Sequence, residues 1–106
     1  MIDRLFSSLG DPTRIAIVER LAREREVSVG ELAAPFAASL PAVIKHIDIL
    51  EDAGVVIRRR QGRNVHCTLS ADAMTEARAW LDRNLGFWTA SFDRLEALID
   101  NKDHDV

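Results

Sequence analysis

Residues 28–69 constrain the fold of this 106-residue chain more than any other segment, because two short helical patterns there flank a tight turn. Ser28 and Glu31 form a capping-box pattern at the start of the first helix, in which each side chain can satisfy a backbone amide of the other residue. A break at residues 38–40 separates this helix from the next apolar pattern. The segment therefore predicts two helices joined by a turn.

The second helix is predicted over residues 41–50. Ser39 is its expected N-cap, and Pro41 falls in the first turn, where a missing amide proton costs nothing. Gly54 follows the helix where a left-handed backbone conformation is usually needed. The apolar positions of the two helices that are expected to face inward are Leu32, Phe36, Leu40, Val43, Ile47 and Leu50. The outward face of the second helix then carries Ala42, Lys45, His46 and Ile49.

A basic β-hairpin is predicted directly after the second helix. After the run VVIRRR, a turn is expected at residues 61–64, and apolar and polar residues alternate over 65–69. Strand alternation places Arg58 and Arg60 on one face and Arg59 on the other. Two helices, a turn and a basic hairpin form the arrangement of a winged helix-turn-helix. The expected fold class is therefore mainly α with a small β-hairpin wing.

Two further helices are predicted before this segment. The apolar residues that line one face of a short first helix are Ile2, Leu5, Phe6 and Leu9. Asp11 is the expected cap of the second of these helices, and Pro12 occupies its first position. The inward stripe of that helix is expected to be Ile15, Val18, Leu21 and Ala22. The charged run at residues 23–26 is interpreted as a solvated helix end and loop.

A long last helix is predicted from a cap at Ser70 to about Asp100. Its apolar positions nearly follow a heptad seam: Met74, Ala77, Leu81, Leu85, Trp88, Phe92, Leu95 and Ile99. Gly86 inside it indicates a kink or a close helix crossing. A helix this apolar in so small a domain needs a partner, which predicts a dimer. We expect a single domain over residues 1–100 and a disordered polar tail at 101–106.

The net charge of −3 is unevenly distributed along the chain. Residues 1–69 hold ten Lys or Arg against nine Asp or Glu, for +1, and residues 70–106 hold four against eight, for −4. Four of the ten basic residues fall within 58–63. Nucleic-acid affinity depends on the local positive face that displaces counterions, so the acidic total does not exclude DNA binding.

Several classes of protein are disfavoured by composition and motifs. No signal-peptide pattern and no apolar run long enough to span a membrane is present, which favours a cytoplasmic protein. Cys67 is the single cysteine, so no intrachain disulfide is possible, and no metal site is expected without clustered ligands. Neither a nucleophile motif nor a phosphate-binding glycine loop occurs, so we expect no catalytic residue, no enzyme activity and no cofactor.

Four motifs follow one another along nearly the whole chain: LGDPTR at 9–14, VGELA at 29–33, SLPAVIKHI at 39–47 and LEDAGVV at 50–56. In their order and spacing the chain resembles the ArsR family of bacterial winged helix-turn-helix repressors. The FW pair at 87–88, followed by LEAL at 95–98, is similar to a branch without a metal-site signature. The resemblance implies a homodimer joined by its first and last helices, with recognition helices in successive major grooves of a near-palindromic operator.

Two residues depart from the family pattern. Relatives commonly have serine at the position of Ile44 and often a basic residue at the position of Asp48. Ile44 offers only apolar contact, for example to a thymine methyl group, whereas serine can bond a phosphate or a base edge. Asp48 opposes the field of the phosphates. Operator sequence and affinity are therefore expected to differ from the family norm.

The expected DNA contacts come from the start of the second helix and from the hairpin: Ser39, Pro41, Ala42, Ile44, Lys45, His46, Arg58, Arg60 and Arg63. Lys45 is well placed for a guanine edge or a phosphate, and Arg60 and Arg63 flank the wing tip for phosphate or minor-groove contact. The expected dimer interface comprises Leu5, Leu81, Leu85, Trp88, Phe92, Leu95 and Ile99.

Alternative interpretations stay open at this point. His46 fits a structural role between helices as well as a base contact, and Ser39 fits a simple cap. Cys67 fits a small core residue better than a one-thiol redox sensor. The aromatic residues of the last helix are consistent with a place in the core, in a dimer interface or in the lining of a ligand pocket. The main hypothesis is a homodimeric repressor of transcription with an unidentified small-molecule inducer possible. The alternatives are a winged-helix protein-interaction module and a regulator that responds to a small molecule or thiol.

Overall fold

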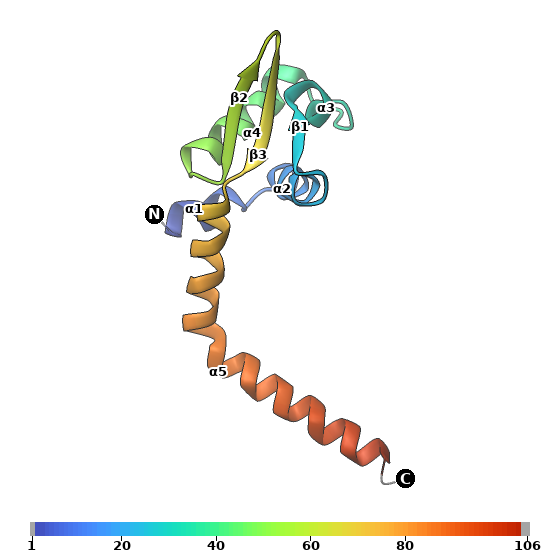
Figure 1. Ribbon diagram of the computed structural model, residues 1–106. Helices are drawn as coiled ribbons and strands as arrows, with labels where there is room; N and C mark the ends of the chain where they lie inside the picture. The colour runs from blue at the N-terminus through green and yellow to red at the C-terminus, as the bar shows by residue number, and fades with distance from the viewer. Residues whose placement is uncertain (1, 105–106) are drawn as a thin grey trace.

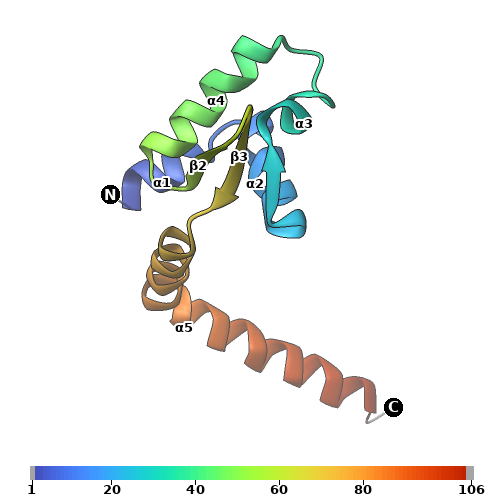
Figure 2. The ribbon, with the colours of Figure 1, turned by 45° about the horizontal axis from the view of Figure 1, so that its top comes forward.

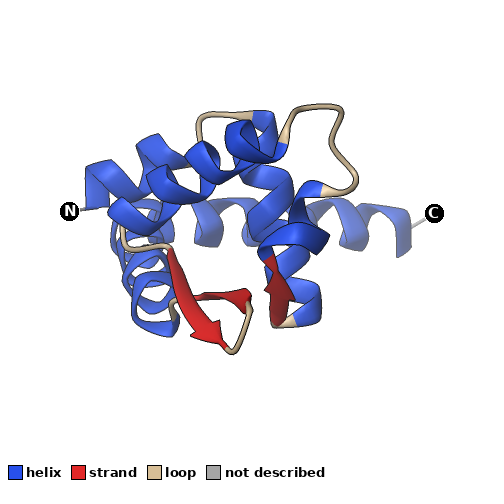
Figure 3. Ribbon diagram, turned by 90° about the horizontal axis from the view of Figure 1, so that it is seen from above, coloured by secondary structure: helices blue, strands red, loops and turns tan. Residues whose placement is uncertain are grey.

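The computed structural model describes residues 2–104, except for the side chains of residues 87–89 and 100–104. Its elements follow one another as α1 Ile2–Ser8, α2 Pro12–Glu24, β1 Glu26–Ser28, α3 Val29–Ala33, α4 Leu40–Asp52, β2 Val56–Gln61, β3 Asn64–Leu69 and α5 Ala71–His104. Figure 1 shows a domain made of α1 to α4 and the three strands, from which α5 extends. Seen from above, the strands lie along one side of this domain and most helices on the other (Figure 3).

The helix ends predicted from the sequence are present. The Asp11 carboxylate accepts hydrogen bonds from the amides of Thr13 (2.8 Å) and Arg14 (3.3 Å) at the start of α2. The Ser28 hydroxyl accepts one from the amide of Glu31 (3.2 Å) at the start of α3. Gly54 after α4 has a φ of +78°, the left-handed conformation that makes glycine suitable there.

The sheet has a third strand that the sequence did not predict. Its order is β1-β3-β2 and both pairings are antiparallel. In β1, Val27 pairs with Cys67 of β3, forty residues later in the chain. The sequence predicted a helix end and loop at residues 23–26 and no strand after them. A three-residue strand has no periodicity of its own and forms only when β3 supplies its partner.

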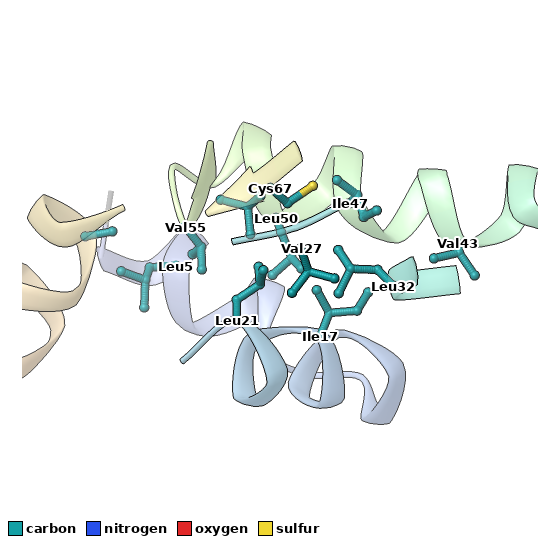
Figure 4. Packing of buried hydrophobic residues seen from close by; sticks show 12 residues of the cluster. Leu5, Ile17, Leu21, Val27, Leu32, Val43, Ile47, Leu50, Val55 and Cys67 are labelled. Carbon is teal, nitrogen blue, oxygen red and sulfur yellow. The ribbon is translucent and has the colours of Figure 1, made fainter. Parts of the chain in front are cut away.

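The core lies between the helices and the inner face of the sheet (Figure 4). Its buried residues are Leu5, Ile17, Leu21, Val27, Leu32, Val43, Ile47, Leu50, Val55, Val56, Cys67 and Ala73. Three inward predictions are wrong. Ile15 is 42 % exposed, Leu40 is 48 % exposed, and Ala22 is exposed as well. The buried stripe of α2 runs through Ile17 and Leu21, and Leu40 is the first residue of α4.

The last helix leaves the domain after its first turns. Ala73 is buried in the core, and the Trp80 ring packs edge-on against Phe6 of α1 at a centroid distance of 5.2 Å. Figures 1 and 2 show that α5 then bends in its orange portion and runs away from the domain. A Cβ added at Gly86 would meet nothing within 4 Å, so no close crossing within the chain accounts for this glycine. The helix continues to His104, past its predicted end near Asp100.

Candidate nucleic-acid interface

Helix α4 has one buried face and one exposed face. Val43, Ile47 and Leu50 are fully buried, as predicted, and point into the core in Figure 4. Lys45 lies on the other side of the helix, is exposed, and forms no ion pair with any residue that the structure describes. Its ammonium group is therefore available to an external anion or hydrogen-bond acceptor.

The first turn of α4 is open to solvent. The Ser39 hydroxyl accepts a hydrogen bond from the amide of Ala42 over 3.4 Å, so Ser39 does cap the helix, although with a long contact. Ser39 and Pro41 are exposed, and Ala42 and Ile44 are half-buried. These small or apolar side chains leave room for another surface to approach the helix closely.

His46 is held within the chain. Its Nδ1 lies 3.0 Å from a guanidinium nitrogen of Arg14 and 3.7 Å from a carboxylate oxygen of Asp11. Arg14 also donates from Nε to the carbonyl oxygen of Ser8 (2.6 Å), the last residue of α1. Of the two roles considered for His46, the structure favours the structural one, because the residue joins α4 to the junction between α1 and α2.

Arg58 is not free on the hairpin, in contrast to its expected role as a DNA contact. Its Nη2 donates to Asp48 (2.6 Å) and to Glu51 (2.7 Å), and its Nε donates to Glu51 (3.1 Å). Through this one side chain, β2 is linked to two successive turns of α4. This pairing has a physical reason, since a guanidinium beside two carboxylates forms charge-assisted hydrogen bonds with them. Arg58 positions the hairpin against the helix.

The same ion pair predicts a specific acid sensitivity. Hydrogen bonds from Arg58 hold the pKa of Glu51 below its ordinary value of 4.5. Because the folded-state pKa is lowered, this pair stabilises the fold above about pH 4.5 and loses its effect as the pH falls through the folded-state pKa. We expect the unfolding free energy, measured in urea between pH 6 and pH 3, to fall less steeply in Glu51→Gln than in the wild type.

Glu76→Gln is the matched control for this acid sensitivity. Glu76 is exposed and has no ion pair in the part of the chain that the structure describes. Its substitution is expected to leave the pH dependence of the wild type in place. Equal slopes for Glu51→Gln and the wild type would show that the pair with Arg58 does not stabilise the fold.

The wing, defined as β2, β3 and the turn between them, carries its other arginines toward the tip. Arg60 pairs with Val65 and lies on the sheet face of Arg58, which packs against α4, whereas Arg59 pairs with His66 on the opposite face. Arg63 lies in the turn next to Gly62, whose φ is +63°. Arg60 and Arg63 are exposed and form no ion pair with the described residues. Lys45, Arg60 and Arg63 are thus the available cations of α4 and the wing face beside it.

Cys67 lies at the centre of the sheet and is fully buried. Burial raises the pKa of its thiol, which disfavours the reactive thiolate. We expect Cys67 in the folded protein to react with a thiol reagent about 10²-fold more slowly than in urea, because reaction requires local unfolding. Absorbance of the released reporter measures both rates. Equally fast labelling of the folded protein would revive the thiol-sensor interpretation.

The residues expected at a dimer interface fall into two groups. Leu5 is only 3 % exposed because it packs in the core of its own chain, so it does not belong to an outer surface. The exposed apolar residues of α5 include Leu81, Leu85, Phe92, Leu95 and Ile99. The side chain of Trp88 lies outside the described residues. The long helix therefore carries an apolar surface over most of its described length.

Metal and membrane sites find no support in the described residues. Among them, no three His, Cys, Asp or Glu side chains come together as metal ligands. None of the described helices combines the length and the apolarity needed to cross a bilayer. The polar groups that can bind a charged partner lie on the surface formed by α4 and the wing.

Sequence reasoning missed the intrachain partners of this surface. Arg14, Asp11 and Glu51 were noted within motifs or caps, but their contacts with His46 and Arg58 were not foreseen. Arg14 and His46 are 32 residues apart, and no local pattern relates them. Only strand alternation carried a usable signal, since it separated Arg58 and Arg60 from Arg59.

Comparison with known proteins places this surface in context. A family model described as a helix-turn-helix domain matches residues 9–59. The chain is 39% identical over 104 residues to the HTH-type transcriptional regulator Rv2034 of Mycobacterium tuberculosis, covering 98% of this chain and 94% of that protein. It is 30% identical to the arsenical resistance operon repressor of Escherichia coli, covering 92% and 81%. A crystal structure of an ArsR family transcriptional regulator, RHA00566, superposes with a TM-score of 0.72 at 39% identity, covering 82% of this chain and 89% of that one.

Proposed function

Because the chain belongs to the ArsR family of winged helix-turn-helix, DNA-binding transcriptional regulators, we propose that it is a homodimeric repressor that occupies a near-palindromic operator. The observation that carries this proposal is the position of the available cations. Lys45 on the exposed face of α4 and Arg60 and Arg63 on the wing have no intrachain ion partner among the described residues. Cations left unpaired beside an exposed helix are what a phosphate backbone requires.

In the proposed complex α4 enters the major groove. Ser39, Pro41 and Ala42 approach the DNA at the start of the helix, and Ile44 and Lys45 reach base edges or phosphates. Arg60 and Arg63 contact the flanking backbone or minor groove. His46 and Arg58 support this surface, because Nδ1 of His46 and Nε and Nη2 of Arg58 are already engaged within the chain.

A second copy of the chain supplies the other half of the proposed repressor. Leu95 and Ile99 are each 53 % exposed, and both lie on the part of the long helix α5 that leaves the domain. Pairing α5 with the α5 of a partner removes this apolar surface from water. It also presents two α4 helices to successive major grooves of a duplex, which matches an operator with two-fold symmetry.

The test combines mass and binding. The wild type is expected to sediment at twice the chain mass of 11.9 kDa and to bind a duplex from upstream of its own gene more tightly than a scrambled duplex in anisotropy titrations. Leu95→Glu is expected to produce monomers with weaker operator binding. The matched control is Ala97→Glu, which places the same charge on the opposite side of α5.

Two results would contradict the proposal. A wild type that stays monomeric at micromolar concentration would exclude the dimer. A wild type with no preference for any promoter duplex at low salt would favour the winged-helix protein-interaction module over a DNA-binding repressor.

A further inference from the structure

Asp48 is an acidic side chain on the part of α4 that we propose to face DNA. It lies three residues after Lys45 and four after Ile44, so the three side chains share one side of the helix. Its side chain is 48 % exposed although it takes part in an ion pair. A carboxylate in this position is repelled by phosphates, which raises the question of what it contributes.

The ion pair with Arg58 leaves part of the Asp48 carboxylate available. Arg58 donates two hydrogen bonds to Glu51, one to each carboxylate oxygen, but only one to Asp48, at Oδ1 (2.6 Å). Oδ2 of Asp48 accepts no hydrogen bond from a residue that the structure describes. Arg58 thus fixes the orientation of Asp48 and partly offsets its charge, and the second oxygen remains a free acceptor.

We propose that Asp48 is a specificity-determining residue that accepts a hydrogen bond from the exocyclic amino group of a cytosine in the major groove. The inference rests on the proposed function. In the major groove cytosine presents an amino donor, whereas guanine presents two acceptors and thymine presents an acceptor and a methyl group. Adenine also has an amino donor, but its N7 acceptor lies beside it and repels a carboxylate. An oriented carboxylate therefore selects cytosine mainly by excluding the other bases.

Such a residue lowers general affinity while it raises discrimination. Replacing Asp48 removes a negative charge from the face toward the phosphates, so binding to arbitrary duplexes is expected to become tighter. The same replacement removes the acceptor, so the preference for cytosine is lost. These opposite changes distinguish base recognition from a purely structural role, for which damage to the wing would weaken binding to every sequence.

The experiment is selection from a randomised duplex library with the full-length wild type, Asp48→Ala, Asp48→Asn and Glu51→Gln, followed by anisotropy titrations on the enriched duplexes. The wild type is expected to enrich one cytosine in each half-site. In Asp48→Ala the affinity ratio between duplexes with and without this cytosine is expected to fall by about fivefold or more, and binding to arbitrary duplexes is expected to become tighter. Asp48→Asn, which keeps the side-chain shape, is expected to shift the preference toward adenine, because an amide can both donate and accept.

Glu51→Gln is the matched control because it alters the other carboxylate partner of Arg58. This variant is expected to keep the preference for cytosine. If the wild type enriches a motif and both Asp48 variants retain every base preference, this inference is overturned while the proposed function stands. If the wild type enriches no motif, the proposed function fails and the inference fails with it. If Glu51→Gln also loses the preference for cytosine, that preference comes from the Arg58 ion pair, and a direct role for Asp48 is overturned.

Discussion

Replacing Arg60 and Arg63 together by glutamine is expected to weaken binding to every duplex by about 4 × 10³-fold at 0.1 M salt. Both side chains are exposed and form no ion pair in the described part of the chain, so each can neutralise one phosphate. Each phosphate contact contributes about eightfold at this salt concentration through counterion release, and a dimer would lose four contacts. The slope of log K against log salt should flatten by about 3.6.

Anisotropy titrations at several salt concentrations measure both quantities. Single substitutions supply the matched comparison, because Arg59→Gln removes the same charge as Arg60→Gln from the opposite face of β2. We expect the slope to change by about 2 for the Arg60 variant in a dimer and by much less for the Arg59 variant. Equal changes in both would show that the wing acts through its total charge and not through one face.

The largest expected effect on stability comes from Ile47→Ala. Ile47 has no exposed surface and packs in the core between the helices and the sheet (Figure 4). Removing its outer carbons leaves a cavity that the neighbours fill only in part, so the free energy of unfolding is expected to fall by about 2–5 kcal/mol. This is a large fraction of the roughly 5–15 kcal/mol that stabilises a typical domain.

Ile49→Ala is the internal control for this prediction. It makes the same chemical change on the same helix, two residues later, at a side chain that is 44 % exposed. Urea unfolding at one fixed protein concentration is the measurement, since dimer formation links stability to concentration. We expect Ile49→Ala to cost about 1 kcal/mol or less. Similar losses for both variants would mean that α4 is not packed through the face that contains Ile47.

The elements of this fold could be predicted where the signal is local. The capping residues Asp11 and Ser28 and the left-handed Gly54 mark helix ends by contacts within a few residues. The hairpin followed from strand alternation around a turn. Strand β1 did not, because its pairing with β3 joins segments forty residues apart. Ile15, Ala22 and Leu40 were wrongly predicted to face inward because helical spacing alone does not fix which of several apolar stripes meets the neighbours.

The candidate site was predictable as a region and less so as a set of roles. Lys45, Arg60 and Arg63 are exposed cations, as their places in the pattern indicated. The sequence left His46 open between a structural role and a base contact, and it placed Arg58 among the expected DNA contacts. In the structure Arg58 is bonded to α4, and His46 contacts Arg14, which is bonded to the end of α1. The apolar surface of α5 was predicted from the sequence, whereas Leu5 of α1, predicted beside it in the dimer interface, is buried in the core of its own chain.

The sequence by itself determined which segments become helices and hairpin, and where basic and apolar side chains recur along them, because periodicity, caps and turns act over a few residues. The tertiary structure alone decided which of those side chains remain available. A side chain can contact another molecule only through polar atoms that no neighbour in space already engages. Such neighbours join Arg58 to Asp48 and Arg14 to His46 across ten and 32 residues of chain.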